Sequence, residues 1–136
     1  MLERKELVPI GYVRSPLKKL EEAPRQGREA GTVATIELLP AYGAGLEGLV
    51  QGIRLLVVCW MHLASRDTLL LRPRRDPSAP LTGVFATRSP NRPNPLAIYT
   101  ADLLEIDGLR LLVRGIDAVD GTPVVDLRPH RPHLDG

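Results

Sequence analysis

The sequence predicts an all-β protein, a small single-domain β-barrel with long loops and little helix. Apolar segments of strand length recur at short and regular spacing, and turn signals rich in Gly, Pro and Asp separate them. A length of 136 residues and a hydrophobic content of 43% fit one domain, so we expect residues 1–136 to share one core. Because aromatic residues make up only 4%, that core should consist mainly of Leu, Val, Ile and Ala.

The first half of the chain contains three expected strands. The first is ELVPIGYV (6–13), whose proline suits an edge strand or a bulge. A polar loop follows at 14–31, and then the alternating strand TVATIELL (32–39). The glycines of PAYGAGLEGLVQG (40–52) leave room for one short helical turn only. IRLLVVCWMHL (53–63) is continuously apolar, and its Val-Val pair and tryptophan favour a buried strand.

The second half alternates apolar segments with turns. TLLLRP and LTGVFA bracket the loop RPRRDPSAP. LAIYTADLLEI and LRLLVRGIDAV flank Asp107-Gly108, which is a strong short-range hairpin signal. Asp120-Gly121 predicts a second turn before PVVDLRPH, and the last residues, RPHLDG, are expected to form a tail.

Composition argues against several classes of protein. The formal net charge of +2 does not by itself indicate nucleic acid, because that signal is charge clustered on one face. The N-terminus MLERKELVPI lacks the apolar segment of a signal peptide, and the longest apolar run is far shorter than the ~20 residues of a membrane span. We therefore expect a soluble cytoplasmic protein without a membrane segment.

Metal and nucleophile chemistry is not indicated. The single cysteine, Cys59, cannot form an intramolecular disulfide, and its apolar neighbours predict a buried side chain. No two histidines have metal-ligand spacing, so we expect no metal site. No Ser-His-Asp or Cys-His arrangement predicts a nucleophilic enzyme.

The segment TRSPNRPNP (87–95) holds three prolines, two arginines and two asparagines. Proline fixes φ and restricts the preceding residue to extended conformations, so this loop has little freedom to lose on binding. It is either a stiff connection between strands or a preorganised loop in which Arg88, Arg92 and Asn94 surround a ligand. It is not a phosphate cradle, because the chain has no Gly-rich phosphate-binding motif.

The segment GIDAVDGTPVVDLRPH (115–130) contains Asp117, Asp120 and Asp126. Asp120 begins a turn and is explained by capping its own backbone. Asp117 and Asp126 are expected inside apolar strands, where a carboxylate needs a partner, and the arginines of the 87–95 loop are natural partners. Such ion pairs are either structural or part of a ligand site.

Three shorter features carry less information alone. APRQG (23–27) fits a solvated loop, and His62, at the end of an apolar run, fits a hydrogen-bonded structural residue better than a ligand. The basic run RPRRDP (72–77) is a solvated loop or, beside Arg88 and Arg92, an RNA-phosphate patch whose binding depends on salt.

These motifs together resemble the TsaA-like, or TrmO-like, family. GVFATRSPNRPNPL and GIDAVDGTPVVDLRPH carry the resemblance, and IGYVRSP, PRQ, LLPAYGAGLEGL and LRPRRD match in order over nearly the whole chain. The resemblance implies a small all-β barrel that binds S-adenosylmethionine and forms homodimers with cofactor pockets near the subunit interface. The best-characterised members methylate N6 of threonylcarbamoyladenosine beside the anticodon of certain tRNAs, so tRNA is the expected partner.

The resemblance also implies a set of cofactor contacts. The matching positions are Pro24, Arg25, Gln26, His62, Leu63, Arg88, Ile98, Asp120, Gly121, Thr122 and Pro123. An arginine among them, Arg25 or Arg88, would clamp the carboxylate of the cofactor. The ribose and adenine of the cofactor suit Gln26, Asp120 and backbone groups in turns.

Catalytic roles follow from the chemistry of the implied reaction. Methyl transfer needs two aligned reactants and little proton chemistry, but the N6 amine is a weak nucleophile and benefits from an acceptor for its N–H. Asn94, Asp117 and Asp126 are the candidate acceptors, and Arg92 would hold a carboxylate or phosphate of the substrate.

Departures from the family pattern keep other functions open. The family's DIKPY stands here as DLRPH, so His130 replaces an aromatic hydroxyl, and the C-terminal domain of some tRNA-modifying members is not expected in this chain. One alternative is a methyltransferase acting on a small molecule. The other is a non-catalytic module that binds S-adenosylmethionine or a nucleotide.

Overall fold

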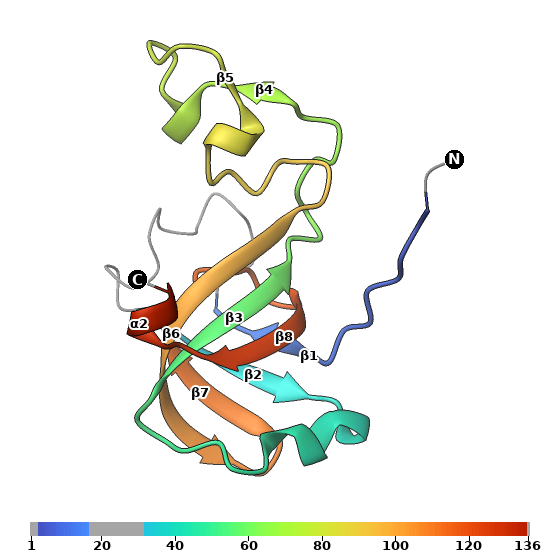
Figure 1. Ribbon diagram of the computed structural model, residues 1–136, viewed down its shortest axis with the longest axis vertical. Coiled ribbons are helices and arrows are strands. Elements are labelled where there is room, and N and C mark those ends of the chain that lie inside the picture. The colour runs from blue at the N-terminus through green and yellow to red at the C-terminus, as the bar shows by residue number, and fades with distance from the viewer. Residues whose placement is uncertain (1–2, 17–31, 136) are drawn as a thin grey trace.

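The computed structural model describes residues 3–16 and 32–135 and confirms the predicted all-β barrel. Six strands close into a barrel in the order β1-β2-β7-β6-β3-β8, and each neighbouring pair is antiparallel (Figure 1). The strands are β1 (Gly11–Arg14), β2 (Val33–Leu38), β3 (Arg54–Trp60), β6 (Leu96–Asp107), β7 (Arg110–Arg114) and β8 (Pro123–Pro129). Closure gives every barrel strand two neighbours, so the sheet has no open edge.

Alternate residues of each strand fill the barrel. On β3, Leu55, Val57 and Cys59 are fully buried, and the residues between them face outward. The core comprises Val13, Ala34, Ile36, Leu38, Leu55, Val57, Cys59, Met61, Ala101, Leu103, Leu111, Val113, Ile116, Ala118 and Val124. Leu, Val, Ile and Ala dominate this set, as the low aromatic content predicted, and the predicted burial of Cys59 is confirmed.

Two irregularities in the ladders bend the sheet as it closes. The β3–β8 register shifts between Val58 and Cys59, and the β6–β7 register shifts between Leu103 and Glu105. An extra residue in one strand of a pair bends that strand and increases its local twist. Bends of this kind help a short-stranded sheet to close on itself.

The long connection between β3 and β6, residues 61–95, is called the arm below. It carries a small sheet made of β4 (Leu70–Leu71) and β5 (Thr82–Gly83), and two 3₁₀ turns, η3 (Pro73–Arg75) and η4 (Val84–Ala86). Figure 1 shows the arm standing beyond one end of the barrel. The two apolar segments expected to bracket the RPRRDPSAP loop therefore pair with each other.

The opposite end of the barrel is covered by η2 (Pro40–Leu46), the short helical turn predicted for this segment. A Cβ on Gly43 would touch the side chain of Leu109, so η2 packs closely on the β6–β7 hairpin. Helix α2 (Pro132–Asp135) follows β8, where a tail was expected. Within residues 3–16 and 32–135, no helix is long and apolar enough to cross a membrane.

Two of the predicted strands are shorter than expected. β1 begins at Gly11 and not at residue 6, because Pro9 has no N–H to contribute to a ladder. Residues 115–119 do not continue β7, since Gly115 adopts a φ of 114° that turns the chain out of the sheet. In both cases a single Pro or Gly ends the pairing inside an apolar run.

The predicted hairpin at Asp107-Gly108 exists, but its turn is displaced by one residue. Asp107 pairs with Arg110, so the two turn residues are Gly108 and Leu109. Gly108 has a φ of 60°, whereas Leu109 has no positive φ. A positive φ at only the first turn residue is the type II′ pattern, not the type I′ pattern that an Asp-Gly turn favours.

Gly11 lies on β1 close to the backbone of β2, and a Cβ at this position would overlap the backbone carbonyl of Glu37. Because backbone atoms cannot move aside cheaply, we expect Gly11→Ala to lower the free energy of unfolding by about 2–3 kcal/mol. Gly45→Ala in η2 is the matched control, since a Cβ there meets nothing within 4 Å. Chemical denaturation should show a change below about 0.5 kcal/mol for the control. Equal losses in the two variants would contradict the assignment.

Candidate functional site

Three connections leave the barrel at the same end. Because paired strands are antiparallel, β1 ends beside the start of β2, and β3 ends beside the start of β6. β7 also ends at the start of β2, and β8 begins at the end of β1. The connections are 15–32, the arm and 115–122, of which 17–31 lie outside the described residues. Most predicted site residues therefore meet at the end that carries the arm in Figure 1, here called the loop end.

The proline-rich 87–95 loop is docked on the turn that follows β3. The backbone N–H of Arg92 donates to the carbonyl of Ser65 at 3.0 Å. In return, the N–H of Ser65 donates to Asn91 Oδ1 at 2.9 Å. These reciprocal bonds join the loop to the turn. Ser65 and Asn91 are 26 residues apart in the sequence, so neither segment is placed by local sequence alone.

Arg66 adds a second connection between the same two segments. Its Nε donates to the carbonyl of Pro93 at 2.8 Å, and its Nη2 lies 3.4 Å from Asn94 Oδ1. The guanidinium also lies 5.0 Å from the ring centre of Trp60, a cation–π distance. Asn94, a predicted acceptor, is therefore an exposed residue of a docked loop.

The two predicted arginines of the loop differ in their contacts. Arg92 Nη1 donates to the carbonyls of Thr87 at 3.2 Å and Ser89 at 3.1 Å, and Nη2 donates to that of Val84 at 2.8 Å. These contacts assign Arg92 to the stability of the loop. The guanidinium of Arg88 is exposed and bonds no other residue in the described ranges. Arg88 is thus the arginine of this loop that is available to an anion.

The predicted Asp120-Gly121 turn is confirmed and is bound to β1. Gly121 has a φ of 85°, and its N–H donates to the carbonyl of Val13 at 2.7 Å. Asp120 Oδ1 accepts a hydrogen bond from the N–H of Ser15 at 3.0 Å. Asp120 therefore begins the turn and also binds the residue that follows β1. The hydroxyl of Thr122 is buried and donates to a carbonyl three residues earlier at 2.7 Å. A Cβ on Gly121 would meet nothing within 4 Å, so the turn borders open space.

Asp117 lies at the rim of the barrel beside side chains of the interior. The hydroxyl of Tyr99, on β6 opposite Val57, donates to Met61 Sδ at 3.9 Å, and the phenol lies close enough to Asp117 to act on the pKa of its carboxyl. Burial raises the pKa of the Asp117 carboxyl, while the bonds from Tyr99 and from its own backbone N–H act in the opposite direction. Burial and, second, the Asp117 charge raise the pKa of the Cys59 thiol to about 12. The thiol therefore stays protonated and unreactive at neutral pH.

The arginine partners expected for Asp117 and Asp126 are not the observed ones. Asp117 takes a phenol as partner and lies in a connection rather than a strand. Asp126 does lie in β8, opposite Val58, but its partner is Arg128, whose Nε is 2.7 Å from Oδ2. Asp126 also lines a hollow beside η2. Asp126 therefore lies on the outer wall of the barrel, where Val58 pairs with it on one side and with Ile98 on the other, and not in the loops of the loop end.

The remaining predicted cofactor residues are distributed around the loop end. His62 and Leu63 are exposed on the turn after β3. Ile98 is 56% exposed on the outer face of β6, and Pro123 begins β8. Pro24, Arg25 and Gln26 lie outside the described residues.

Sequence reasoning missed three residues of this end: Tyr99, Asn91 and Arg66. Tyr99 lies within an apolar run, where alternation predicts only a core residue. Asn91 was visible as a second asparagine in a proline-rich loop, a residue type that often serves backbone groups. No sequence signal distinguished Arg66 from a solvated arginine.

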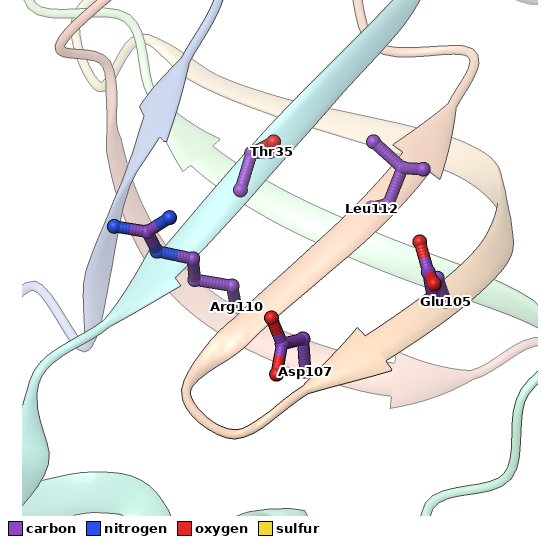
Figure 2. Close-up of a pocket in the computed structure, with 5 residues that line it drawn as sticks. All are labelled: Thr35, Glu105, Asp107, Arg110 and Leu112. Carbon is purple, nitrogen blue, oxygen red and sulfur yellow. The ribbon is translucent and has the colours of Figure 1, made fainter.

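Two hollows lie elsewhere on the barrel. One of about 160 Å³ is lined by Thr35, Glu105, Asp107, Arg110 and Leu112, and Figure 2 shows these side chains on strands of the barrel wall. The other, of about 350 Å³, lies between η2 and β8. Among residues 3–16 and 32–135, no three His, Cys, Asp or Glu side chains are gathered as a metal site requires.

Comparisons with known proteins cover nearly the whole chain. The family model described as the tRNA-methyltransferase O N-terminal domain matches residues 12–136. A protein of Archaeoglobus fulgidus named S-adenosyl-L-methionine-binding protein is 42% identical over 129 residues, which are 95% of this chain and 91% of that protein. A longer protein of the same organism, named "Probable S-adenosyl-L-methionine-binding protein", is 44% identical over 130 residues, which are 96% of this chain and 35% of that protein.

A solved structure gives the same match in three dimensions. The crystal structure of TrmO from Pseudomonas aeruginosa has a TM-score of 0.80 and 34% identity, and the alignment covers 98% of this chain and 59% of that one. The chain thus spans 35% of the longer archaeal relative and 59% of the bacterial protein, but 91% of the shorter archaeal relative. The likeness covers the barrel that relatives of different length share.

The two arginines of the 87–95 loop should differ in their effect on stability. Arg92→Ala removes three bonds to backbone carbonyls, and we expect the free energy of unfolding to fall by about 2–4 kcal/mol. Arg88→Ala, the matched control in the same loop, should change it by less than about 0.5 kcal/mol. Chemical denaturation measures both, and a destabilising Arg88→Ala with a neutral Arg92→Ala would reverse the assignment.

The raised pKa of Asp117 makes stability depend on pH. Folding favours the protonated, neutral form of the Asp117 carboxyl. The free energy of unfolding is therefore highest below the ordinary pKa of 3.8, and it falls as the pH rises through the pKa of the folded state. Asp117→Asn stays neutral and keeps an acceptor for Tyr99. Its free energy of unfolding, measured by denaturation from acid to neutral pH, should therefore rise relative to the parent as pH increases. A difference that does not vary with pH would show that the carboxyl is not held at a raised pKa.

Proposed function

The chain belongs to the tRNA-methyltransferase O N-terminal domain family, and we propose on this basis that it is an S-adenosylmethionine-dependent methyltransferase. The observation that carries the proposal is the match of the family model over residues 12–136. The gathering of His62, Arg88 and the 120–123 turn at one end of the barrel supports it, since these are positions where the family resemblance implies cofactor contacts.

The residues of the loop end fit the chemical groups of the cofactor. Arg88 offers an exposed guanidinium for the carboxylate, and Asp120 offers an acceptor beside the exit of β1 for hydroxyl or amine groups. The open space over Gly121 leaves room for a ligand against backbone groups of the turn. When bound, the cofactor supplies a methyl group activated on a sulfonium.

The proposed acceptor of that methyl group is N6 of threonylcarbamoyladenosine in tRNA. The description of the family model as a tRNA methyltransferase domain supports this substrate, as does the 34% identity to the bacterial protein titled TrmO. Proximity and alignment of the two reactants supply most of the rate in such a transfer.

Asp117 is the best-placed candidate to accept the N6 proton. It lies at the rim of the barrel, and burial raises its pKa, which makes its carboxylate a stronger proton acceptor than an exposed aspartate. The bond from Tyr99 orients the carboxylate. Asn94 is a second candidate for holding the N–H, because its amide oxygen is exposed and has only a long contact with Arg66.

We also propose that the protein acts as a homodimer. Leu96 and Ile98, neighbours on the outer face of β6 beside the loop end, are exposed apolar side chains that a second copy would cover. Such an interface would place the partner next to the cofactor residues.

A binding module without catalysis is the second candidate. The Archaeoglobus fulgidus relative of similar length carries a name that refers to cofactor binding only. The two candidates differ in one observable, the transfer of a methyl group.

Labelled S-adenosylmethionine, the purified protein and total tRNA from a strain lacking the gene test the proposal directly. We expect label in methylated threonylcarbamoyladenosine after digestion of the tRNA. Asp117→Asn should reduce kcat by about 100-fold and leave cofactor affinity unchanged, because it removes the proton acceptor. Arg88→Ala should raise the cofactor Kd by about 10–100-fold, measured by calorimetry.

The outcomes separate the candidates. No label with intact cofactor binding would indicate the binding module, and label in a small molecule without tRNA would indicate a different substrate. Full activity in both variants would contradict the roles given to Asp117 and Arg88.

A further inference from the structure

The positive charge of the chain is concentrated in the arm. Residues 61–95 contain six arginines and two acidic residues, a formal charge of +4, whereas the whole chain has +2. The rest of the chain is therefore at −2. The small net charge of the whole chain is thus the sum of a basic arm and a slightly acidic remainder. The arm protrudes from the barrel in Figure 1, and a protruding basic element is typical of proteins that bind nucleic acid.

The outer part of the arm, residues 69–86, is held together by its own hydrogen bonds. β4 pairs with β5, Arg72 Nη1 donates to the carbonyl of Ala79 at 2.7 Å, and Asp76 Oδ1 accepts from both the N–H and the hydroxyl of Ser78. Val84 is buried and connects the outer arm to the docked 87–95 loop through the Arg92 bond. The arginines of the outer arm therefore belong to a segment that its own hydrogen bonds hold in shape.

Arg74 occupies a backbone conformation that disfavours arginine. It is the one non-glycine residue with a positive φ, 57°, in the part of the chain that the structure describes. The left-handed region is unfavourable for a residue with a Cβ, and glycine or asparagine would adopt it more easily. The turn itself therefore does not explain the arginine at this position, and its side chain is exposed.

Phe85 adds an aromatic surface to this element. It is the only phenylalanine in the sequence, and 81% of it is exposed. Phe85 and the exposed arginines Arg72 and Arg74 belong to the same element, and single-stranded nucleic acids bind such elements because bases stack on the ring while the cations neutralise phosphates.

We propose that the outer arm is an RNA-binding element in which Arg72 and Arg74 contact phosphates and Phe85 stacks on an unpaired base of the RNA. The inference rests on the proposed function, since it assigns the surface by which the tRNA substrate is held next to the loop end. The concentrated charge and the arginine at a left-handed position favour RNA over a protein partner. Leu69, Leu70 and Leu81 are also exposed on the arm, so a second copy of the chain is the alternative occupant.

The test uses the full chain and a synthetic anticodon stem-loop RNA that carries threonylcarbamoyladenosine. Arg74→Asn removes one charge and relaxes the backbone, so weaker binding cannot be attributed to a destabilised turn. Phe85→Ala removes the ring. Arg110→Gln and Val50→Ala are matched controls, because both residues are exposed and belong to the barrel end opposite the arm. Fluorescence anisotropy at several salt concentrations gives the RNA affinity, and sedimentation velocity gives the oligomeric state.

We expect Arg74→Asn to lower the slope of log affinity against log salt by about 0.7, the value for one phosphate contact on a single strand. Phe85→Ala should weaken binding about tenfold with an unchanged slope, the effect of one lost stacking contact. Neither control should change the affinity by more than about twofold.

Arm variants that bind RNA as tightly as the controls would overturn the inference, and so would a parent protein that does not bind the RNA. Variants that lose self-association but keep RNA affinity would overturn it in favour of an interface between copies. Failure of the proposed function looks different, because then the parent transfers no methyl group to RNA whatever residues the arm carries.

Discussion

The seven-residue antiparallel pairing of β3 with β6 determines where the arm and Tyr99 lie at the loop end. The ladder ends at Trp60 and Leu96, and the bond from the Met61 N–H to the Pro95 carbonyl, 2.7 Å long, continues it into the arm. Both ends of the arm are therefore fixed side by side on the rim of the barrel. The same register places Tyr99 inside the barrel opposite Val57, where it meets Asp117. The β3–β6 ladder thus brings the ends of the arm and the side chain of Tyr99 to the same rim of the barrel.

The composition of the 87–95 loop explains why two similar arginines behave differently. Its three prolines have no N–H, and the loop forms no strand, so its carbonyls need donors from elsewhere. Arg92 supplies donors to Thr87 and Ser89 of the loop, and to Val84 just before it. The prolines that stiffen the loop therefore also create the need for an internal arginine. Once Arg92 meets that need, Arg88 is left exposed on a loop that is already ordered.

The sequence was sufficient for the barrel class and for the existence of the barrel strands and of the Asp120-Gly121 turn, because these depend on periodicity and on Gly, Pro and Asp at fixed places. It was not sufficient for the end points of two strands and the position of one turn. Gly115 ended β7 inside an apolar run, and the β6–β7 turn moved from Asp107-Gly108 to Gly108-Leu109. Neither displacement is visible in hydrophobic alternation, which both registers satisfy in part.

The candidate site was predicted as a set of residues, but not as a set of contacts. The phenol that hydrogen-bonds Asp117 comes from another strand, and the register of a closed barrel selects it. Asp126 is also an aspartate in an apolar stretch of the sequence, yet its side chain faces outward and forms an ion pair with Arg128. Composition cannot distinguish two such carboxylates, because the direction of each side chain follows from strand pairing.

The position of Asp117 joins the stability of the barrel to its chemistry. A carboxyl partly removed from water at the rim of an apolar barrel costs stability at neutral pH, and an apolar residue would avoid that cost. Burial also raises the pKa of the Tyr99 phenol, which therefore remains a hydrogen-bond donor at any physiological pH. A permanent donor beside Asp117 lowers the pKa of its carboxyl and so opposes the effect of burial. The burial that weakens the fold also raises the pKa of Asp117, so its carboxylate holds a proton more strongly than an exposed aspartate does.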